Sequence, residues 1–253
     1  MSRIIAIANQ KGGVAKTTTA VNLSSWISIM GRRVLLVDID PQGNAGSGLG
    51  LDKEELEYTI YDVLINGVGA EKAIVGCPVE NLHVLPSRIE LAGAEIEMVS
   101  VEGREYLLKG ALQGIKDSYD FIIIDCPPSL GLLTINAMAA ADSVLIPIQC
   151  EYYALEGVGQ LLNTIGLVQK GTNRDLKIEG VLLTMFDGRT NLSIQVVDEI
   201  KRHFRDKVYR SIVPRNVRLS EAPSHGKPVM VYDRRSRGAE VYHDLAKEVL
   251  GIE

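Results

Sequence analysis

The sequence predicts a doubly wound α/β fold, in which helices flank a mostly parallel β-sheet. Short β-branched apolar runs, typical of buried strands, alternate with longer segments whose apolar residues recur at helical spacing. Acidic residues follow two of these runs directly, as they do at the carboxyl edge of a parallel sheet. No stretch between the runs is richer in Gly, Pro or Ser than a loop, so residues 1–253 are expected to form a single domain.

The N-terminal stretch predicts a strand, a glycine turn and a helix. The apolar run from Ile4 to Ala8 is short and β-branched, as in a buried strand. Gly12 and Gly13 follow in a turn, and from Thr19 to Met30 apolar residues recur every three or four positions. A glycine turn between a strand and a helix start can cradle phosphate, because backbone N–H groups and the positive end of the helix dipole attract an anion.

Two side chains give this loop its chemistry. In the usual phosphate loop a lysine bridges the outer phosphates and the next Ser or Thr ligates Mg²⁺, and these roles fall to Lys16 and Thr17. Gln10 and Ala15 stand where the pattern has Gly, and a further lysine, Lys11, stands at the loop entrance. We expect the following loop residues to contact the nucleotide: Lys11, Gly12, Gly13, Val14, Ala15, Lys16, Thr17 and Thr18.

Ala15 is the departure with a physical consequence. An alanine is tolerated at this position only if its backbone stays out of positive φ. We therefore expect Ala15 to avoid that conformation, and phosphate affinity or turnover to be weaker than with glycine. A glycine turn that binds no ligand is the alternative, and the placement of Lys16 and Thr17 disfavours it.

A second buried strand, from Val34 to Asp38, ends in acidic residues. Asp38 closes the run, and Asp40 follows in the sequence Asp-Pro-Gln-Gly-Asn. Acids at this place belong at the carboxyl edge of the sheet, where ligands bind. A capped turn with solvated acids is the alternative, which is weaker beside a phosphate loop.

A third run, from Phe121 to Asp125, matches a Walker B strand. Its carboxylate, Asp125, would hold the Mg²⁺ shell through water from the neighbouring parallel strand. Pro127 and Pro128 stiffen the loop that follows. Four apolar residues and an aspartate are weak evidence alone. They are strong evidence about 110 residues after a phosphate loop and directly before Pro-Pro-Ser.

The rest of the chain alternates in the same way. Further strands are expected at residues 82–86, 143–147, 178–185 and 208–213, and helices at 58–64, 87–99, 103–115, 151–170, 192–204 and 239–250. Segment 214–228 has proline at each end of its loop and cannot form one continuous helix. The stripe formed by Leu91, Ala94 and Met98 is expected to be core or interface packing.

Composition limits where the protein acts. Apolar residues at 46% and charged residues at 23% are ordinary for a soluble globular protein. No apolar run approaches the roughly 18 residues of a spanning helix, and the N-terminus is unlike a signal peptide. The three cysteines lack CxxC spacing and are expected to be reduced thiols. We expect a cytoplasmic protein without stable membrane association.

The charge distribution suggests a DNA surface despite a net charge of −5. Residues 188–220 carry eight Lys or Arg against three acids, a surplus of five positive charges, so the rest of the chain carries −10. Aromatic interleaving and a reading helix are lacking, so contacts would be to phosphates and sensitive to salt. A solvated basic helix face is the alternative. The DNA candidates are Arg189 and Arg218, expected on two loops, and Lys201, Arg202 and Arg205, expected on the helix between them.

The chain resembles the ParA/MinD superfamily of ATPases with a deviant phosphate loop, and within it the chromosomal ParA/Soj proteins. The resemblance covers nearly the whole chain, including the early-lysine loop, Asp-Pro-Gln-Gly-Asn, Ile-Asp-Cys-Pro-Pro-Ser-Leu-Gly and Pro-Arg-Asn-Val-Arg-Leu-Ser-Glu-Ala-Pro-Ser. It implies ATP and Mg²⁺ as cofactors, weak intrinsic ATPase activity and a face-to-face homodimer that binds double-stranded DNA nonspecifically. It also implies a ParB/Spo0J-type partner that stimulates hydrolysis, so that chromosomal origins are segregated on the nucleoid.

The resemblance implies further residue roles. Lys11 would reach the partner subunit's ATP, Asp40 would position or activate the attacking water, and Asp38 would stand behind the Mg²⁺ ligands. Residues near the adenine would be Met185, Pro214 and Asn216.

Three alternative functions remain open. A MinD-like membrane-cycling ATPase would end in a basic amphipathic helix, whereas residues 239–253 carry one lysine against four acids. An ATP-dependent amidoligase or reductase partner would need a substrate pocket or metal ligands that the sequence does not indicate. An ATP-binding regulator without turnover is the third alternative, and Ala15 keeps it open.

Overall fold

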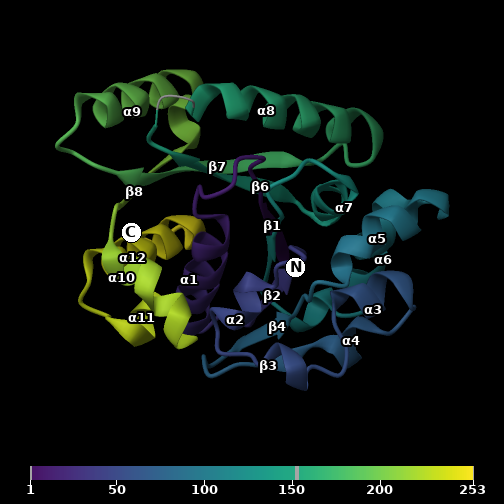
Figure 1. The fold of residues 1–253 in the computed structure, drawn as a ribbon. Helices are drawn as coiled ribbons and strands as arrows, with labels where there is room; N and C mark the ends of the chain where they lie inside the picture. The colour runs from purple at the N-terminus through teal and green to yellow at the C-terminus, as the bar shows by residue number, and fades with distance from the viewer. Residues whose placement is uncertain (1, 152–153, 253) are drawn as a thin grey trace.

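The computed structural model describes residues 2–151 and 154–252, and its strands form one eight-stranded sheet (Figure 1). Their order is β3-β4-β2-β5-β1-β6-β7-β8. In the described part of the chain every strand pairing is parallel except that of β3 with β4. The strands are β1 (Arg3–Ile7), β2 (Val34–Asp38), β3 (Val75–Gly76), β4 (Leu82–Leu85), β5 (Phe121–Asp125), β6 (Ser143–Gln149), β7 (Lys177–Phe186) and β8 (Val208–Pro214).

Helices cover both faces of the sheet, as a doubly wound fold requires. Figure 1 shows α8 and α9 on one side of it and α1, α10 and α12 on the other. The α-helices are α1 (Lys16–Ile29), α2 (Asn44–Ser47), α3 (Ile60–Ile65), α4 (Ala70–Ala73), α5 (Leu91–Glu97), α6 (Leu107–Gln113), α7 (Leu132–Ala140), α8 (Ala154–Gly171), α9 (Asn191–Phe204), α10 (Val217–Glu221), α11 (Val229–Tyr232) and α12 (Arg237–Leu250).

Alternate side chains of the central strands enter two separate cores. In β1, Ile4 and Ala6 pack with residues of α3 and α5 to α9, whereas Ile5 and Ile7 pack with residues of α1, α11 and α12. Because both faces are covered, the strands are apolar throughout rather than alternating. This is why the sequence shows them as continuous apolar runs.

The predicted strands lie within two residues of their expected bounds, and the helices differ more. The predicted helices at 87–99 and 103–115 are shorter than expected, because Gly103 takes φ +69° and 3₁₀ turns at Met98–Ser100 and Arg104–Tyr106 interrupt them. The helix predicted from Glu151 is described from Ala154, and residues 152 and 153 lie outside the described residues. The sequence did not predict β3, α2, α4, α7, α10 or α11. All but α7 are too short to show a period, and α7 is buried on nearly all sides, so it lacks the amphipathic pattern of a surface helix.

The sheet topology brings the predicted site residues to one edge. Asp125 of β5 is the register partner of both Ile7 on β1 and Asp38 on β2. Beyond Ile7 the chain continues into the loop at residues 8–15 and then into α1. The strand order reverses at β1, and such a switch point is where α/β proteins bind ligands.

Candidate nucleotide-binding site

The loop at residues 8–15 is fixed to the neighbouring strand. Asn9 Nδ2 donates to the carbonyl oxygen of Pro147 at 2.7 Å, and Asn9 Oδ1 accepts from the Lys11 N–H at 3.0 Å. Gly13 takes φ +74°, a conformation that glycine adopts without strain. Among the described residues no side chain caps α1, so the N–H groups of its first turn can meet an anion.

Ala15 adopts the left-handed conformation that we expected it to avoid. Its φ is +68° and its ψ is +33°, so that expectation is wrong. The conformation costs a residue with a Cβ roughly 1–2 kcal/mol. It persists because the Ala15 carbonyl accepts the first bonds of α1, from the Thr19 N–H at 2.9 Å and from Thr19 Oγ1 at 2.7 Å. The strain is therefore located where the loop joins the helix.

We expect Ala15→Gly to stabilise the protein by about 0.5–1 kcal/mol. Glycine removes a left-handed penalty of roughly 1–2 kcal/mol and adds roughly 0.5–1 kcal/mol of unfolded-state entropy. Chemical denaturation would measure the change. The control is Ala111→Gly in α6, where the backbone is ordinary helix and a loss of roughly 0.5–1 kcal/mol is expected. A less stable Ala15→Gly variant would show that the alanine is not strained.

Two buried carboxylates, Asp38 and Asp125, stand side by side at the carboxyl edge. They are register partners on neighbouring strands and neither is exposed. Asp38 is well bonded: Oδ1 accepts from the Asp40 N–H at 3.1 Å, and Oδ2 accepts from the N–H groups of Ala45 at 2.9 Å and Gly46 at 3.4 Å. Asp38 thus holds the loop that carries Asp40.

Asp125 has no such partners. Both of its carboxylate oxygens are buried, and neither has a hydrogen-bond partner within the described residues. Burial and then the charge of Asp38 raise the pKa of Asp125 well above its usual value, and Thr17 and Lys16 nearby lower it. An unpaired buried carboxylate costs several kcal/mol unless a cation or donor reaches it.

This arrangement fits Mg²⁺. Magnesium in nucleotide sites keeps several waters and takes one or two protein oxygens beside the phosphates, and Asp125 and Thr17 supply such oxygens. In the described part of the chain, no three His, Cys, Asp or Glu side chains are grouped to hold a metal alone. The remaining ligands of a Mg²⁺ ion here would come from nucleotide and water.

The buried pair predicts a pH dependence of stability. Burial raises the pKa of Asp38 to about 7, whereas an unfolded aspartate titrates near ~3.9. Between these values the folded protein binds more protons than the unfolded chain, so stability falls as pH rises through that window. In the nucleotide-free protein, Asp38→Asn is expected to remove roughly 2–4 kcal/mol of this fall. Denaturation midpoints across the window measure it, with the exposed Asp175→Asn as control. An unchanged slope would contradict the assignment.

Lys16 and Asp40 complete the group around Asp125. Lys16 is 6% exposed, and its Nζ donates to the Lys11 carbonyl at 3.0 Å. Burial lowers the pKa of Lys16, and Asp125 and Asp40 nearby raise it. Asp40 is 7% exposed, and its Oδ1 accepts from the Gln42 N–H at 3.0 Å. The structure therefore brings the two predicted catalytic residues of the carboxyl edge together.

Lys11 lies at the entrance of the loop and is paired within its own chain. Its Nζ is 3.4 Å from Glu151 Oε2. Glu151 also accepts from Arg215 Nη2 at 3.1 Å and from Gln149. Sequence reasoning missed Glu151, because no motif marks a carboxylate that follows β6.

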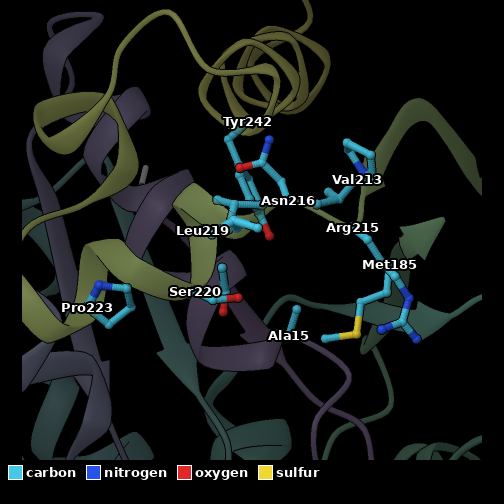
Figure 2. Close-up of a pocket in the computed structure, with 12 residues that line it drawn as sticks. Ala15, Met185, Val213, Arg215, Asn216, Leu219, Ser220, Pro223 and Tyr242 are labelled. Carbon is cyan, nitrogen blue, oxygen red and sulfur yellow. The ribbon is translucent and has the colours of Figure 1, made fainter. Parts of the chain in front are cut away.

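A cavity of about 510 Å³ adjoins the loop between the ends of β7 and β8 and the start of α10 (Figure 2). It is lined by Met185, Pro214 and Asn216, the three residues predicted to lie near adenine. Figure 2 shows Ala15 and Met185 on one side of it and Asn216 and Tyr242 on the other. The sequence did not predict these lining residues: Val213, Arg215, Val217, Leu219, Ser220, Pro223 and Tyr242.

Two features of this cavity indicate a built site. Ala15 and Met185, with φ of +68° and +51°, are two of the four non-glycine residues with positive φ in the described chain. Such strain gathers at ligand sites. Tyr242 comes from α12, and its hydroxyl lies 3.0 Å from Thr19 Oγ1, which ties the C-terminal helix to the helix that follows the loop.

The five DNA candidates do not form one patch. Arg189 lies in the turn after β7, at the carboxyl edge. Arg218 lies in the first turn of α10 at the same edge, and not on a loop as expected. Because α9 runs back across the sheet, Lys201 and Arg202 near its end lie about 15 Å along the helix from its start at the carboxyl edge. Arg205 follows the end of α9, with φ +50°, and is not on that helix as expected.

Both carboxyl-edge arginines are paired with acids. Arg189 makes two hydrogen bonds to Asp187, at 2.9 and 2.7 Å, which hold the pKa of Asp187 at about 2. Arg218 pairs with Glu221 at 2.8 Å and Asp233 at 3.3 Å. These pairs lie at the surface, where solvent screens ion pairs and leaves them with little net stability, so a phosphate could compete for either arginine.

The loop after the central strand, its helix and the two aspartates place the chain among the P-loop nucleoside triphosphatases. Residues 2–178 match a family model described as an AAA domain. The chain is 66% identical over 249 residues to the sporulation initiation inhibitor protein Soj of Bacillus subtilis, covering 98% of each. It is 55% identical over 250 residues to the chromosome partitioning protein ParA of Myxococcus xanthus, covering 99% of this chain and 88% of that one. The chain belongs to the ParA/Soj family of chromosome-partitioning ATPases.

Solved structures share the whole fold. The cobyrinic acid a,c-diamide synthase of Mycobacterium smegmatis, with bound ATP analogue and magnesium, has a TM-score of 0.89 and 42% identity, covering 99% of this chain and 94% of that one. The cell division ATPase MinD of Pyrococcus furiosus has a TM-score of 0.82 and 29% identity, covering 99% of each. The predicted fold class and family are confirmed.

Proposed function

We propose that this chain is a single-domain, cytoplasmic and nucleoid-associated ATPase that partitions chromosomes. With ATP and Mg²⁺ bound, two copies pair face to face and bind double-stranded DNA without sequence preference. A ParB/Spo0J-type centromere-binding protein stimulates hydrolysis, and the cycle segregates chromosomal origins and influences replication initiation or sporulation. The convergence at one loop of Lys16, Asp40 and Asp125, whose carboxylate has no hydrogen-bond partner among the described residues, carries the proposal in a chain 66% identical to Soj.

Each residue of the site has a task in this proposal. Bound Mg²⁺ would neutralise charge on the β- and γ-phosphate oxygens. Lys16 adds positive charge at the same oxygens, and Thr17 and Asp125 hold the ion, Asp125 through water. Asp40 orients the attacking water. Asp38 acts behind them, since its bonds to Asp40 and to the start of α2 fix the loop that Asp40 stands on.

Lys11 makes hydrolysis depend on pairing. It would leave Glu151 and reach the nucleotide of the partner subunit, adding positive charge where negative charge shifts in the transition state. The cavity lined by Met185, Pro214 and Asn216 would hold the adenine. Both assignments rest on the family resemblance and on where the structure places these residues.

DNA binding is tested by removing Arg189 and Arg218 together. Each phosphate contact contributes about 0.9 to the slope of log affinity against log salt concentration. Arg189→Ala with Arg218→Ala is therefore expected to lower the slope by about 2 per protomer and to weaken binding at moderate salt, while ATP binding is unchanged. The matched control is Lys201→Ala with Arg202→Ala, at the opposite edge. Weaker binding in the control pair alone would place the DNA surface there.

Helix α12 does not offer the free basic amphipathic face of a MinD-like membrane anchor. In the described residues no helix is long and apolar enough to span a membrane. The apolar face of α12 is buried against α1 and β8 and is not available to lipid; it consists of Ala239, Val241, Tyr242, Leu245, Ala246 and Val249. Glu253, counted among the acids of this segment, lies outside the described residues. Sedimentation with anionic liposomes and ATP is expected to leave the protein in the supernatant.

An amide-forming activity is the second candidate function, because the similar solved structure from Mycobacterium smegmatis is named a cobyrinic acid a,c-diamide synthase. The higher identity to Soj, 66% against 42%, favours partitioning. Incubation with cobyrinic acid, ATP, Mg²⁺ and glutamine separates the two. Formation of an amide product would overturn the partitioning assignment.

A further inference from the structure

Residues 89–99, which comprise α5 and the turns on either side of it, are apolar on two opposite faces. One face lies in the core and consists of Leu91, Ala94 and Met98, as their spacing predicted. The other faces solvent: Ile89 is 62% exposed, Ile96 78% and Val99 61%. These three lie seven and then three positions apart, so they form one stripe.

The chain that follows carries two more exposed apolar residues. Val101 and Tyr106 are each 40% exposed. We call the five residues Ile89, Ile96, Val99, Val101 and Tyr106 the α5 surface. They are five of the twelve exposed large apolar residues of the described chain, within a segment of 18 residues. Exposed apolar residues scattered singly need no explanation, but a gathered set marks a binding site.

The charge around the α5 surface indicates its occupant. Residues 89–106 contain five glutamates and one arginine, a net charge of −4. Glu90, Glu97 and Glu102 are exposed, and the one arginine, Arg104, is paired with Glu105 at 3.3 Å. A second copy of this chain in a symmetric contact would bring two such surfaces of −4 together, and DNA would be repelled.

We propose that the α5 surface binds a cationic amphipathic segment of a protein partner. Apolar side chains of that segment would pack on Ile96 and Val99, and its lysines or arginines would pair with the glutamates around them. The binding of such a segment does not depend on the proposed function. An effect of this binding on ATP turnover does rest on the proposed function.

A contact in the fold connects this surface to the site. Glu95 lies on α5 beside the exposed stripe, and its Oε1 accepts from the Leu133 N–H at 3.2 Å, in the first turn of α7. A Cβ on Gly131 would collide with the same carboxylate. Residues 126–131 join Asp125 to α7. A segment bound on α5 would therefore act, through Glu95, on the loop that follows Asp125.

The test uses a fluorescent amphipathic helical peptide built of leucine and lysine, with its scrambled sequence as control, and the full chain. Affinity for the peptide is measured by fluorescence anisotropy. The double variant Ile96→Ser with Val99→Ser is expected to bind the peptide at least roughly tenfold more weakly than the parent. Leu167→Ser with Ile194→Ser, which alters exposed apolar residues of α8 and α9, is expected to bind as the parent does. Glu97→Gln with Glu102→Gln is expected to weaken binding more than Glu54→Gln with Glu55→Gln.

Each of three results would overturn the proposed binding at the α5 surface. The Ile96/Val99 variant would bind the peptide as tightly as the parent, the scrambled peptide would bind equally well, or the parent would not bind the peptide. ATPase measured with a ParB-type protein then tests the proposed function separately. If the peptide binds at the α5 surface but the ParB-type protein does not stimulate the parent, the surface stands and the proposed stimulation fails.

Discussion

A Lys11→Ala variant is expected to lose the part of ATP turnover that rises with protein concentration, by roughly 10²–10³-fold, the usual effect of removing one donor that stabilises transition-state charge. In the structure Lys11 is paired with Glu151 of its own chain, at 3.4 Å, at the entrance of the loop. A lysine that acts only across the dimer contributes nothing to the monomer. ATP binding to the monomer is therefore expected to survive. Initial rates over a range of protein concentrations measure the effect.

Glu151→Gln is the matched variant for this prediction. It removes the charge that holds Lys11 and Arg215 within the chain, so Lys11 can leave more easily. Concentration-dependent turnover is then expected to begin at lower protein concentration than in the parent. If Lys11→Ala kept cooperative, concentration-dependent ATPase activity, Lys11 would have no role across the dimer.

Asp125→Asn is expected to change activity and stability in opposite directions. Loss of the carboxylate weakens the hold on Mg²⁺, so turnover at limiting Mg²⁺ should fall by roughly 10²-fold or more. Without nucleotide the same variant should be more stable than the parent at neutral pH, because it removes a buried carboxylate that lacks any partner among the described residues. Mg²⁺ titrations of the ATPase and denaturation of the nucleotide-free protein measure the two effects.

Asp120→Asn is the control for this pair of effects. Asp120 precedes β5 at the opposite end of the strand, is half-buried, and accepts from the Arg33 N–H at 2.8 Å, a bond that asparagine can keep. Neither turnover nor stability is expected to change much. A less stable Asp125→Asn protein without nucleotide would mean that the carboxylate is satisfied in a way that the structure does not indicate.

The sequence predicted the carboxyl-edge chemistry because each part lies in one short segment. Lys16 and Thr17 follow a glycine turn, and Asp38 and Asp125 end apolar runs of β2 and β5. In a parallel sheet the ends of such runs meet at one edge, so their proximity follows from the fold class alone. The register of Asp38 with Asp125 bears this out.

What the sequence could not predict depends on long-range contacts. The left-handed conformation of Ala15 is imposed by the junction of loop and helix, against the intrinsic preference of alanine. Tyr242 and Glu151 reach the site from α12 and from the end of β6, and no local pattern marks them. The basic segment looked continuous, but α9 crosses the sheet and separates Lys201 from Arg189.

The mass of the protein in solution tests the central claim most directly. Light scattering on a sizing column, with and without saturating ATP and Mg²⁺ and then with nonspecific duplex DNA, separates the possible states. We predict a monomer without nucleotide and a dimer with ATP and Mg²⁺. We also predict that only the dimer forms complexes with DNA. A protein that stays monomeric with saturating nucleotide and ignores DNA at low salt would contradict the proposed cycle.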